Sequence, residues 1–254
     1  MPFVVSNDGS TLKKYQPEED QTSALEVVVP GTFTIIGKEA FYEAYDVHSV
    51  IIEEGIKKIG SSAFCACGMN KISLPKSLEE IAYDAFGHCT KLAEVVLPDN
   101  LKKLGKSPFT NCACDVIVSE NNNLLKTVNR KLFSKDGKKL IFYPTNCKET
   151  KYIVPDGTQI IGELAFAWNE HITEIVLPEG VKEIKGGAFG SCETLERIVI
   201  PASVRKIDIE FEMETFDAMS SWYPQKRETF IIEAPKGSYA IEFAKEHEIK
   251  YVEV

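Results

Sequence analysis

A repeated residue pattern constrains the fold of this 254-residue chain more than any other feature. Residues 92–112 read LAEVVLPDNLKKLGKSPFTNC, and the skeleton L-x-x-V-x-L-P-x-x-L-x-x-L-G-x-x-P-F-x-x-C recurs along the sequence. With the proline as the anchor, the equivalent positions are Pro30, Glu53, Pro75, Pro98, Pro155, Pro178 and Pro201. Successive anchors are 22 or 23 residues apart, except for one step of 57 that we interpret as a turn of 23 plus an insert of 34. This near-constant period predicts a solenoid in which each repeat forms one turn.

Apolar side chains occupy the same positions in every turn. Residues one and three places before the anchor, such as Leu97 and Val95, are apolar or aromatic, and this spacing of two puts both on one face of a strand. Ile or Leu stands six places after the anchor. Eleven places after it, six turns carry Phe41, Phe64, Phe86, Phe109, Phe166 and Phe189. We expect these positions to fill the coil, and because one turn cannot bury them alone, the turns must stack.

The period and the L-x-x-L-x-L spacing are typical of a leucine-rich repeat. The full pattern, L-x-x-I-x-L-P-x-x-L-x-x-I-G-x-x-A-F-x-x-C, resembles the repeat of the BspA-like bacterial surface proteins over about residues 24–216. The segments LKTVNRKLFSKDGKKLIFYP and GSYAIEFAKEHEIKYVEV also resemble that family's mid-array insert and C-terminal segment. The resemblance implies an α/β solenoid, a right-handed superhelix with one parallel sheet, irregular or short helical turns opposite, and a capping hairpin and helix. It also implies recognition or adhesion at a cell surface.

Two segments outside the repeats predict hairpins. In 3–15, FVVSNDGSTLKKY, two short strands flank Asn7-Asp8-Gly9, which is typical turn chemistry. The segment 132–143, LFSKDGKKLIFY, repeats its Ser, Asp, Gly, Leu and Tyr at identical spacing. The predicted organisation within one continuous solenoid domain is a hairpin cap at 1–22, repeats one to four at 23–118, an inserted hairpin at 119–148, repeats five to seven at 149–226 and a C-terminal cap at 227–254.

The end of the chain predicts a helix followed by a strand. Ser238 is placed to N-cap a helix with Ala240, Phe243, Ala244 and His247 on one face, and IKYVEV alternates like a strand. Upstream, the seventh repeat loses its pattern after Asp208, which predicts a helix near 210–219 or a longer loop. We expect Trp222-Tyr223-Pro224 to cover the end of the core, with a partner anchor as the alternative.

The repeat also departs from its pattern at the glycine seven places after the anchor. Ala82, Lys185 and Asp208 replace it. If the position requires a positive φ, Asp is tolerated there, whereas Ala and Lys are strained.

Net charge and segment composition narrow the partners and the compartment. A net charge of −9 and a pI near 5.1 disfavour nucleic acid and anionic membranes, which attract Lys and Arg. No apolar run reaches the roughly 18 residues of a membrane span, and residues 1–15 lack a signal-peptide pattern. The missing signal pattern and seven free Cys favour a cytoplasmic location, whereas the family resemblance favours a cell-surface or secreted one. Both alternatives stay open.

The cysteines are predicted to be structural. Cys67, Cys89, Cys112 and Cys192 stand fourteen places after the anchor, where leucine-rich repeats place a small buried polar residue that bonds loop backbone. The pairs Cys65/Cys67 and Cys112/Cys114 invite a metal interpretation. They lie two turns apart, however, roughly 10 Å at strand spacing, which is too far for one zinc ion or a disulfide.

Nothing in the sequence predicts catalysis. The four His fall in different columns, and no phosphate loop, metalloprotease or calcium-loop motif is present. We therefore expect no enzyme activity, no cofactor and no metal.

The predicted binding residues form two columns on the outward face of the sheet. Two places before the anchor, the outer column consists of Val28, Ile51, Ser73, Val96, Ile153, Val176 and Val199. Four places before it, the charged column consists of Glu26, Ser49, Lys71, Glu94, Lys151, Glu174 and Arg197. β-branched residues suit any sheet surface, but a continuous outward apolar stripe is also typical of a protein-binding face. Opposite charges on neighbouring strands predict the pairs Lys71–Glu94, Lys151–Glu174 and Glu174–Arg197, each worth about 0.2 to 1 kcal/mol.

Two functions fit this surface. One is a recognition module that binds a protein or glycan on the sheet face through Ile51, Val96, Ile153, Val176 and Val199, with the charged column as a polar rim. The other is a scaffold or surface-layer component that associates with its own copies. No nucleic-acid partner and no membrane insertion are expected, and a monomer is favoured.

Overall fold

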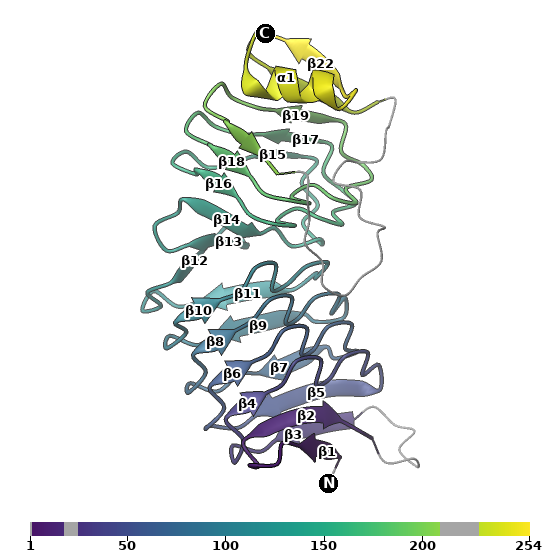
Figure 1. The fold of residues 1–254 in the computed structure, drawn as a ribbon, viewed down its shortest axis with the longest axis vertical. Helices are drawn as coiled ribbons and strands as arrows, with labels where there is room; N and C mark the ends of the chain where they lie inside the picture. Colours follow the sequence, from purple (N-terminus) through teal and green to yellow (C-terminus); the bar gives the residue numbers. More distant parts are fainter. Residues whose placement is uncertain (1, 18–24, 209–228) are drawn as a thin grey trace. The chain divides into compact units, whose positions relative to one another are not determined.

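The computed structural model describes residues 2–17, 25–208 and 229–254 (Figure 1). It divides the chain into two compact units, Met1–Lys135 and Asp136–Val254. Each unit is a stack of solenoid turns with parallel strands, as the repeat predicts. The predicted domain boundaries within the repeat array stay a prediction. The predicted helix near 210–219, the Trp222-Tyr223-Pro224 cover and residues 18–22 of the predicted hairpin cap lie outside the described residues.

Unit 1 contains a row of long strands, one for each turn. These are β3 (Leu25–Val29), β5 (Val47–Ile52), β7 (Lys71–Ser73), β9 (Glu94–Leu97) and β11 (Asp115–Val118). The first three form one parallel sheet and the last two another. The break is bridged by a hydrogen bond from the Ala93 N–H to the Asn70 carbonyl, 3.2 Å. β11 belongs to a further solenoid turn that the anchor pattern did not reveal, because Ser119 stands at the position of the anchor proline.

A second row of short strands runs beside the first. In unit 1 it consists of β2 (Thr11–Tyr15), β4 (Ile35–Ile36), β6 (Lys58–Ile59), β8 (Glu80–Ile81) and β10 (Lys103–Leu104), all paired in parallel. The sequence analysis foresaw the solenoid but not this row, because a strand of two residues has no period to detect. Of the residues six places after the anchor, Ile36, Ile59 and Ile81 pack into the core, whereas Leu104 is half-buried.

Unit 2 has the same two rows. The long strands are β15 (Lys151–Ile153), β17 (Glu174–Val176), β19 (Arg197–Val199), β21 (Ile231–Ala234) and β22 (Lys250–Glu253). The short strands are β14 (Lys139–Phe142), β16 (Ile160–Ile161), β18 (Glu183–Ile184) and β20 (Lys206–Ile207). β22 confirms the predicted terminal strand. β21 was missed, although Pro235 follows it as an anchor would, because a longer segment separates it from Pro201.

The phenylalanine column forms the centre of each unit. Consecutive rings in unit 1 stack at 4.8 Å (Phe41 and Phe64), 5.5 Å (Phe64 and Phe86) and 5.5 Å (Phe86 and Phe109). In unit 2, Phe166 and Phe189 stack at 5.5 Å. All six rings are buried. The spacing follows from the separation of neighbouring strands, about 4.8 Å, so that one ring for each turn suffices to fill the core without a gap.

Each turn bends sharply on both sides of its phenylalanine. Two residues with positive φ, nine and thirteen places after the anchor, bracket the ring in six turns, for example Ser62 (52°) and Ala66 (55°). Between them the Phe64 N–H donates to the Ala85 carbonyl of the next turn, 2.8 Å. Leu164 (50°) and Trp168 (61°) occupy the same two places in unit 2, although left-handed backbone disfavours bulky side chains. The other turns use Asp, Asn, Ser, Gly, Glu, His or Ala there.

The glycine seven places after the anchor has a different role from the one expected. Gly37, Gly60, Gly105 and Gly162 do not have positive φ. A Cβ on Gly60 would instead lie 2.7 Å from the carbonyl carbon of Gly37, and one on Gly105 would lie 2.4 Å from that of Ala82. The residue is therefore small because two neighbouring turns approach closely, so strain from a positive φ at Ala82 or Lys185 was the wrong explanation.

The N-terminal hairpin is present and covers the first turn. β1 (Phe3–Val5) pairs antiparallel with β2, and the Ser10 N–H donates to Asp8 Oδ1 across the turn, 3.1 Å. Tyr15 stacks on Phe41 at 5.1 Å, so the hairpin extends the phenylalanine column by one ring.

The insert also contains a hairpin, formed by β12 (Leu125–Val128) and β13 (Lys131–Ser134) within unit 1. Its two turn residues, Asn129 and Arg130, both have positive φ, as a two-residue hairpin turn requires. The sequence analysis instead predicted a hairpin over 132–143, which crosses the boundary between the units and stays a prediction.

At the start of unit 2, β14 repeats the contacts of β2. The Tyr143 N–H donates to the Ala165 carbonyl, 2.8 Å, as the Tyr15 N–H donates to the Ala40 carbonyl, 2.7 Å. The Lys138 N–H donates to Asp136 Oδ1, 3.0 Å, as Ser10 does to Asp8. The residues matched between the two segments therefore perform matched roles.

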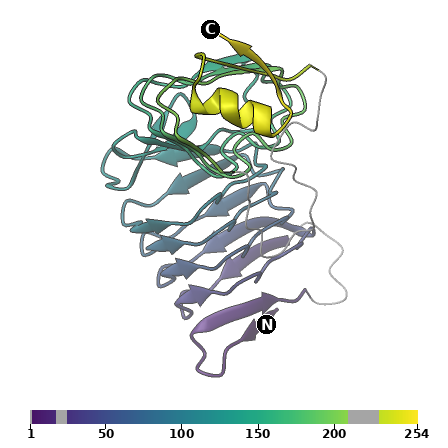
Figure 2. The same ribbon diagram turned by 45° about the horizontal axis from the view of Figure 1, so that its top comes forward.

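The C-terminal helix α1 (Tyr239–Glu246) packs against the end of unit 2, where Figure 2 shows it in yellow. Ala240, Phe243 and Ala244 are buried as predicted. Ser238 occupies the N-cap position, but its hydroxyl makes no capping bond and has no hydrogen-bond partner. The predicted capping bond was therefore wrong. No helix among the described residues combines the length and apolar composition that crossing a membrane requires.

Candidate functional site

The outer column of unit 1 is exposed along its sheet surface. Val28 on β3, Ile51 on β5 and Val96 on β9 are 44%, 38% and 54% exposed, whereas their strand neighbours Val29, Ile52 and Leu97 are buried. The alternation follows from the strand, in which successive side chains point to opposite faces. β11 adds Ile117, paired with Val96 and 43% exposed, which the sequence analysis missed together with its strand.

Unit 2 places six of the predicted residues together on three paired strands. Lys151 and Ile153 lie on β15, Glu174 and Val176 on β17, and Arg197 and Val199 on β19. The register aligns Ile153, Val176 and Val199 across the sheet. Ile153 is 63% exposed, and the two valines are half-buried. The remaining predicted residues, Ile51, Lys71, Glu94 and Val96, belong to unit 1.

The charged column of unit 2 forms a chain of ion pairs. Lys151 Nζ lies 3.0 Å from Glu174 Oε1, and the Arg197 guanidinium lies 3.8 Å from the same oxygen. Arg197 also pairs with Glu233 on β21, a partner that sequence reasoning missed. Both predicted pairs are confirmed. Because these side chains are partly exposed, each pair contributes only about 0.2 to 1 kcal/mol, but together they fix the polar edge of the apolar column.

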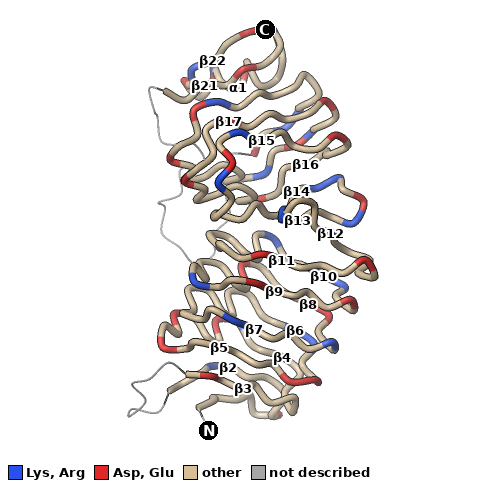
Figure 3. The backbone as a smooth tube through the Cα atoms, turned by 180° about the vertical axis from the view of Figure 1, so that it is seen from behind, with Lys and Arg blue, Asp and Glu red and all other residues tan. Residues whose placement is uncertain are grey.

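Unit 1 does not repeat that arrangement. Lys71 and Glu94, the predicted third pair, are not among the ion pairs of the described residues, because β7 and β9 belong to separate sheets at this point. Earlier in the charged column, between β3 and β5, the Ser49 hydroxyl donates a hydrogen bond to Glu26 Oε2, 3.1 Å, and no cation is involved. Figure 3 shows acidic and basic residues interspersed on the strands of both units.

The cysteine column is buried and hydrogen-bonded to backbone. The thiols of Cys89, Cys112 and Cys192 donate to the carbonyls of Phe64, Phe86 and Phe166, one turn back, at 2.9, 3.0 and 3.0 Å. Cys67 makes a longer bond, 3.5 Å, to the Ala44 carbonyl. These contacts confirm the structural role of the column. In the fifth turn Asn169 replaces Cys, and its Oδ1 accepts from the His171 and Ile172 N–H groups at 2.9 and 2.8 Å.

Burial also disfavours the thiolate form of these cysteines. It raises the pKa of Cys67 to about 11 and raises the pKa of Cys89 and Cys112 well above their ordinary value. Burial likewise lowers the pKa of His88. None of the seven cysteines forms a disulfide, and the described residues contain no group of three or more His, Cys, Asp or Glu side chains placed to hold a metal ion.

Comparison with solved structures supports the fold. The chain is similar to a leucine-rich repeat protein from Eubacterium ventriosum, with 22% identity, a TM-score of 0.64, and coverage of 79% of this chain and 62% of that one. It is similar to the pneumococcal vaccine antigen PcpA, with 17% identity, a TM-score of 0.57, and coverage of 100% and 88%. A leucine-rich repeat protein from Bacteroides ovatus shares 20% identity at a TM-score of 0.52, with coverage of 92% and 62%.

The first and third of these matches span less than two thirds of the related protein. None of the curated proteins compared with the chain matches it. The model of the BspA type leucine rich repeat region, in six copies, matches residues 19–140 and 138–220. Because these ranges include most of the chain and the described turns show the stacked columns that the repeat encodes, the protein belongs to the BspA-type leucine-rich repeat family.

Proposed function

We propose that this chain is a non-catalytic recognition module that binds a protein, or a glycan, on the outward faces of its long-strand sheets. The observation that carries the proposal is the exposed apolar column, Val28, Ile51, Val96 and Ile117 in unit 1 and Ile153, Val176 and Val199 in unit 2. Sheet surfaces of this kind offer a rigid apolar contact whose backbone is already hydrogen-bonded. The bacterial surface-protein type of the family supports an adhesive setting for that contact.

The charged column supports the same face. In unit 2 the Lys151, Glu174 and Arg197 side chains are ordered by their mutual ion pairs, which lowers the entropy lost when a partner covers them. Ile153 stands beside them as the most exposed of the predicted apolar binding residues. An apolar centre with an ordered polar rim is the usual arrangement of a protein interface.

The test compares two variants of the full chain against immobilised panels of extracellular proteins and glycans. Val96→Asp combined with Val176→Asp changes the outer column in both units without touching the core. Tyr45→Asp changes a side chain that is 65% exposed but lies outside the column. We expect the double variant to lose binding by about tenfold or more and the control to bind like the parent. Equal binding by folded parent and double variant would move the site away from this face.

Self-association is the second candidate, and β22 is the observation that favours it. All four residues of β22 are exposed, and the strand lies at the end of its five-stranded sheet. An exposed strand edge is a template for pairing with another chain. Light scattering after size exclusion separates the two functions, because only the scaffold predicts a mass that grows with protein concentration.

A further inference from the structure

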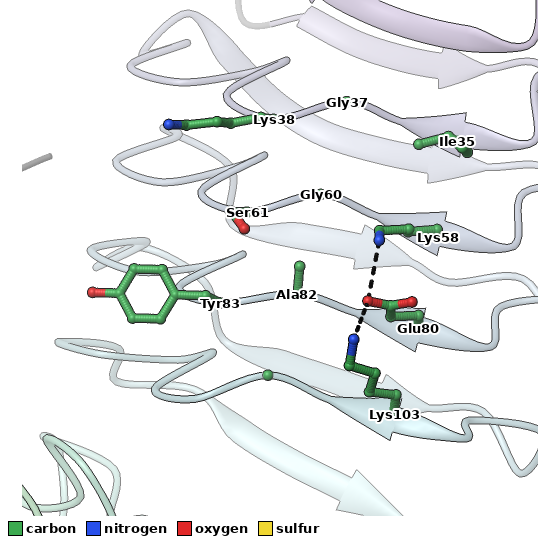
Figure 4. Close-up of a pocket in the computed structure, with 11 residues that line it drawn as sticks. Ile35, Gly37, Lys38, Lys58, Gly60, Ser61, Glu80, Ala82, Tyr83 and Lys103 are labelled. Carbon is green, nitrogen blue, oxygen red and sulfur yellow. Dashed lines mark hydrogen bonds and ion pairs between the residues drawn. The ribbon is translucent and has the colours of Figure 1, made fainter. Parts of the chain in front are cut away.

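Unit 1 carries a second surface feature that the sheet-face proposal does not use. A hollow of about 520 Å³ lies over the short strands β4, β6, β8 and β10 (Figure 4). Its floor consists of the residues seven places after the anchor, Gly37, Gly60, Ala82 and Gly105. Four successive turns contribute to it, which gives a length of roughly 15 Å at strand spacing. We call this feature the lateral groove.

The floor is flat because the backbone requires it. A Cβ on Gly60 would lie 2.7 Å from the backbone of Gly37, and a Cβ on Gly105 would lie 2.4 Å from the backbone of Ala82. Its main-chain donors are also occupied, since the Gly37, Gly60 and Gly105 N–H groups donate to carbonyls one turn back at 2.8, 2.8 and 2.7 Å. A ligand on this floor therefore meets Cα atoms and one methyl group, and it gains no backbone hydrogen bond from the floor's N–H groups.

The walls of the groove carry excess positive charge. One wall is a ladder in which Lys58 Nζ and Lys103 Nζ lie 3.2 and 2.9 Å from the same Glu80 oxygen. The hydrogen bond from Lys103, followed by that from Lys58, lowers the pKa of Glu80, so the carboxylate stays ionised between two ammonium groups. The other wall includes Lys38 and the polar side chains of Ser61 and Tyr83. The lining thus contains three lysines and one glutamate, although Lys38 also pairs at 3.5 Å with Glu39, which lies outside the lining.

Unit 2 shows the same position without an open floor. There the floor residues are Gly162, Lys185 and Asp208, and Lys185 Nζ is bound to Glu183 at 2.5 Å and to Asp208 at 3.6 Å. The positions that are Gly or Ala in unit 1 therefore carry two charged, mutually paired side chains in unit 2. Glu183 is the equivalent of Glu80 and Lys206 that of Lys103, but Ile160 stands where unit 1 has Lys58, so unit 2 repeats only part of the lysine wall.

We propose that the lateral groove of unit 1 binds an acidic polysaccharide, with the flat face of successive sugar rings on the floor and the ring carboxylates on Lys58 and Lys103. The lysine excess is complementary to a polyanion, and charge-assisted bonds to carboxylates are the strongest that these side chains can make. An extended acidic peptide fits less well. Peptides that lie along a sheet gain most of their affinity from main-chain pairing, and the floor's N–H groups are already occupied.

The first experiment tests the floor. Ala82→Lys introduces the side chain that unit 2 carries at Lys185, and Glu80 is present to bind it as Glu183 binds Lys185, so the variant should fold. Oligogalacturonates serve as the probe and neutral malto-oligosaccharides as the ligand control, measured calorimetrically with the full chain. We expect the parent to bind only the acidic probe, and Ala82→Lys to bind it at least about tenfold more weakly, although the variant has gained a positive charge.

The second experiment tests the wall independently of the floor. Lys58→Gln with Lys103→Gln removes two charges that line the groove. The control, Lys57→Gln with Lys102→Gln, removes two charges from the adjacent ladder, in which Lys57 Nζ and Lys102 Nζ lie 3.2 and 2.6 Å from the Glu79 carboxylate. Neither of these lysines lines the groove. We expect the first pair to lose at least about tenfold in affinity and the second pair less than about threefold, and we expect parental binding to weaken as salt screens the lysines.

Four results would overturn the proposal. No binding of the acidic probe by the parent at low salt excludes the ligand class. Equal loss in the two lysine pairs means a diffuse electrostatic attraction and not a groove. Undiminished binding by folded Ala82→Lys places the ligand elsewhere, and if that variant fails to fold, the lysine pairs decide alone. Tighter binding of a poly-glutamate peptide than of the sugar probe would identify a peptide site.

Discussion

The two units share a core and differ at surface positions, and the difference shows how this repeat separates stability from recognition. Both stack one phenylalanine for each turn and bracket it with left-handed residues. Seven places after the anchor, however, unit 1 has Gly or Ala, whereas unit 2 has Lys185 and Asp208 after its one glycine. The inner columns are constrained by contact with the next turn. The position seven places after the anchor is glycine where a Cβ would meet the neighbouring turn, but other turns accept Ala82, Lys185 or Asp208 there, so only unit 2 carries charged side chains at it.

The charged columns differ in the same way. Unit 2 links Lys151, Glu174 and Arg197 on strands that pair without a break, whereas Lys71 and Glu94 of unit 1 lie on strands of separate sheets. Ion pairing between side chains of neighbouring strands therefore depends on an unbroken ladder of backbone hydrogen bonds between those strands. Opposite charges at matching sequence positions do not suffice.

The largest expected effect tests the shared core. Phe64→Ala in unit 1 and Phe166→Ala in unit 2 each remove a buried ring that stacks on its neighbours, and each should lower the free energy of unfolding by about 3 to 5 kcal/mol. Chemical denaturation monitored by circular dichroism measures the loss, with Tyr45→Ala as an exposed control. A cost below about 1 kcal/mol in only one unit would show that the two cores are not equivalent.

The glycine position tests the difference between the units. Gly105→Ala places a Cβ 2.4 Å from the backbone of Ala82, so we expect a loss of about 1 to 3 kcal/mol. Lys185→Ala in unit 2 shortens a partly exposed side chain at the equivalent position and should change the stability by less than about 1 kcal/mol. Thermal unfolding compares the two variants. If Gly105→Ala is as stable as the parent, close approach of the turns does not explain the glycine.

The cysteine column predicts a dependence on pH. Burial raises the pKa of Cys67, Cys89 and Cys112 in unit 1, so above pH 9 the unfolded chain loses thiol protons that the folded chain keeps. The free energy of unfolding should therefore fall as the pH rises, by up to about 1.4 kcal/mol per pH unit for each thiol. The double variant Cys89→Ala with Cys112→Ala should show a smaller fall of the free energy of unfolding between about pH 9 and about pH 10. An unchanged slope in the variant would assign the effect to other groups.

The smallest effect separates the charged columns. Glu174→Gln removes the carboxylate that Lys151 and Arg197 share, and the free energy of unfolding should fall by about 0.2 to 1 kcal/mol. Glu94→Gln in unit 1 should change it by less, because the Lys71–Glu94 pair is not formed. Both differences should shrink at high salt. A larger loss from Glu94→Gln than from Glu174→Gln would contradict the assignment.

The inner columns show how far sequence reasoning reaches. The phenylalanines, the Ile and Leu of the short strands and the bonded cysteines all recur at one period, so their burial and stacking could be predicted. The solenoid turns that contain β11 and β21 could not be predicted. The first lacks the proline anchor, and the second follows a longer segment than the repeat period. The candidate site was predicted in part. The outer column is exposed and two ion pairs are present, but Ile117 and Glu233 lie on the two strands that the pattern missed.

The sequence by itself determined that this chain is a stack of turns, because a period of 22 or 23 residues with apolar side chains at fixed places can bury them only against the next turn. Only the tertiary structure revealed the features that depend on contacts between turns. The second row of strands exists through pairing between residues one turn apart. The glycines are required by backbone approach across turns and not by their own φ. The lateral groove is the consequence, since a space left by absent side chains becomes a surface only when successive turns are aligned.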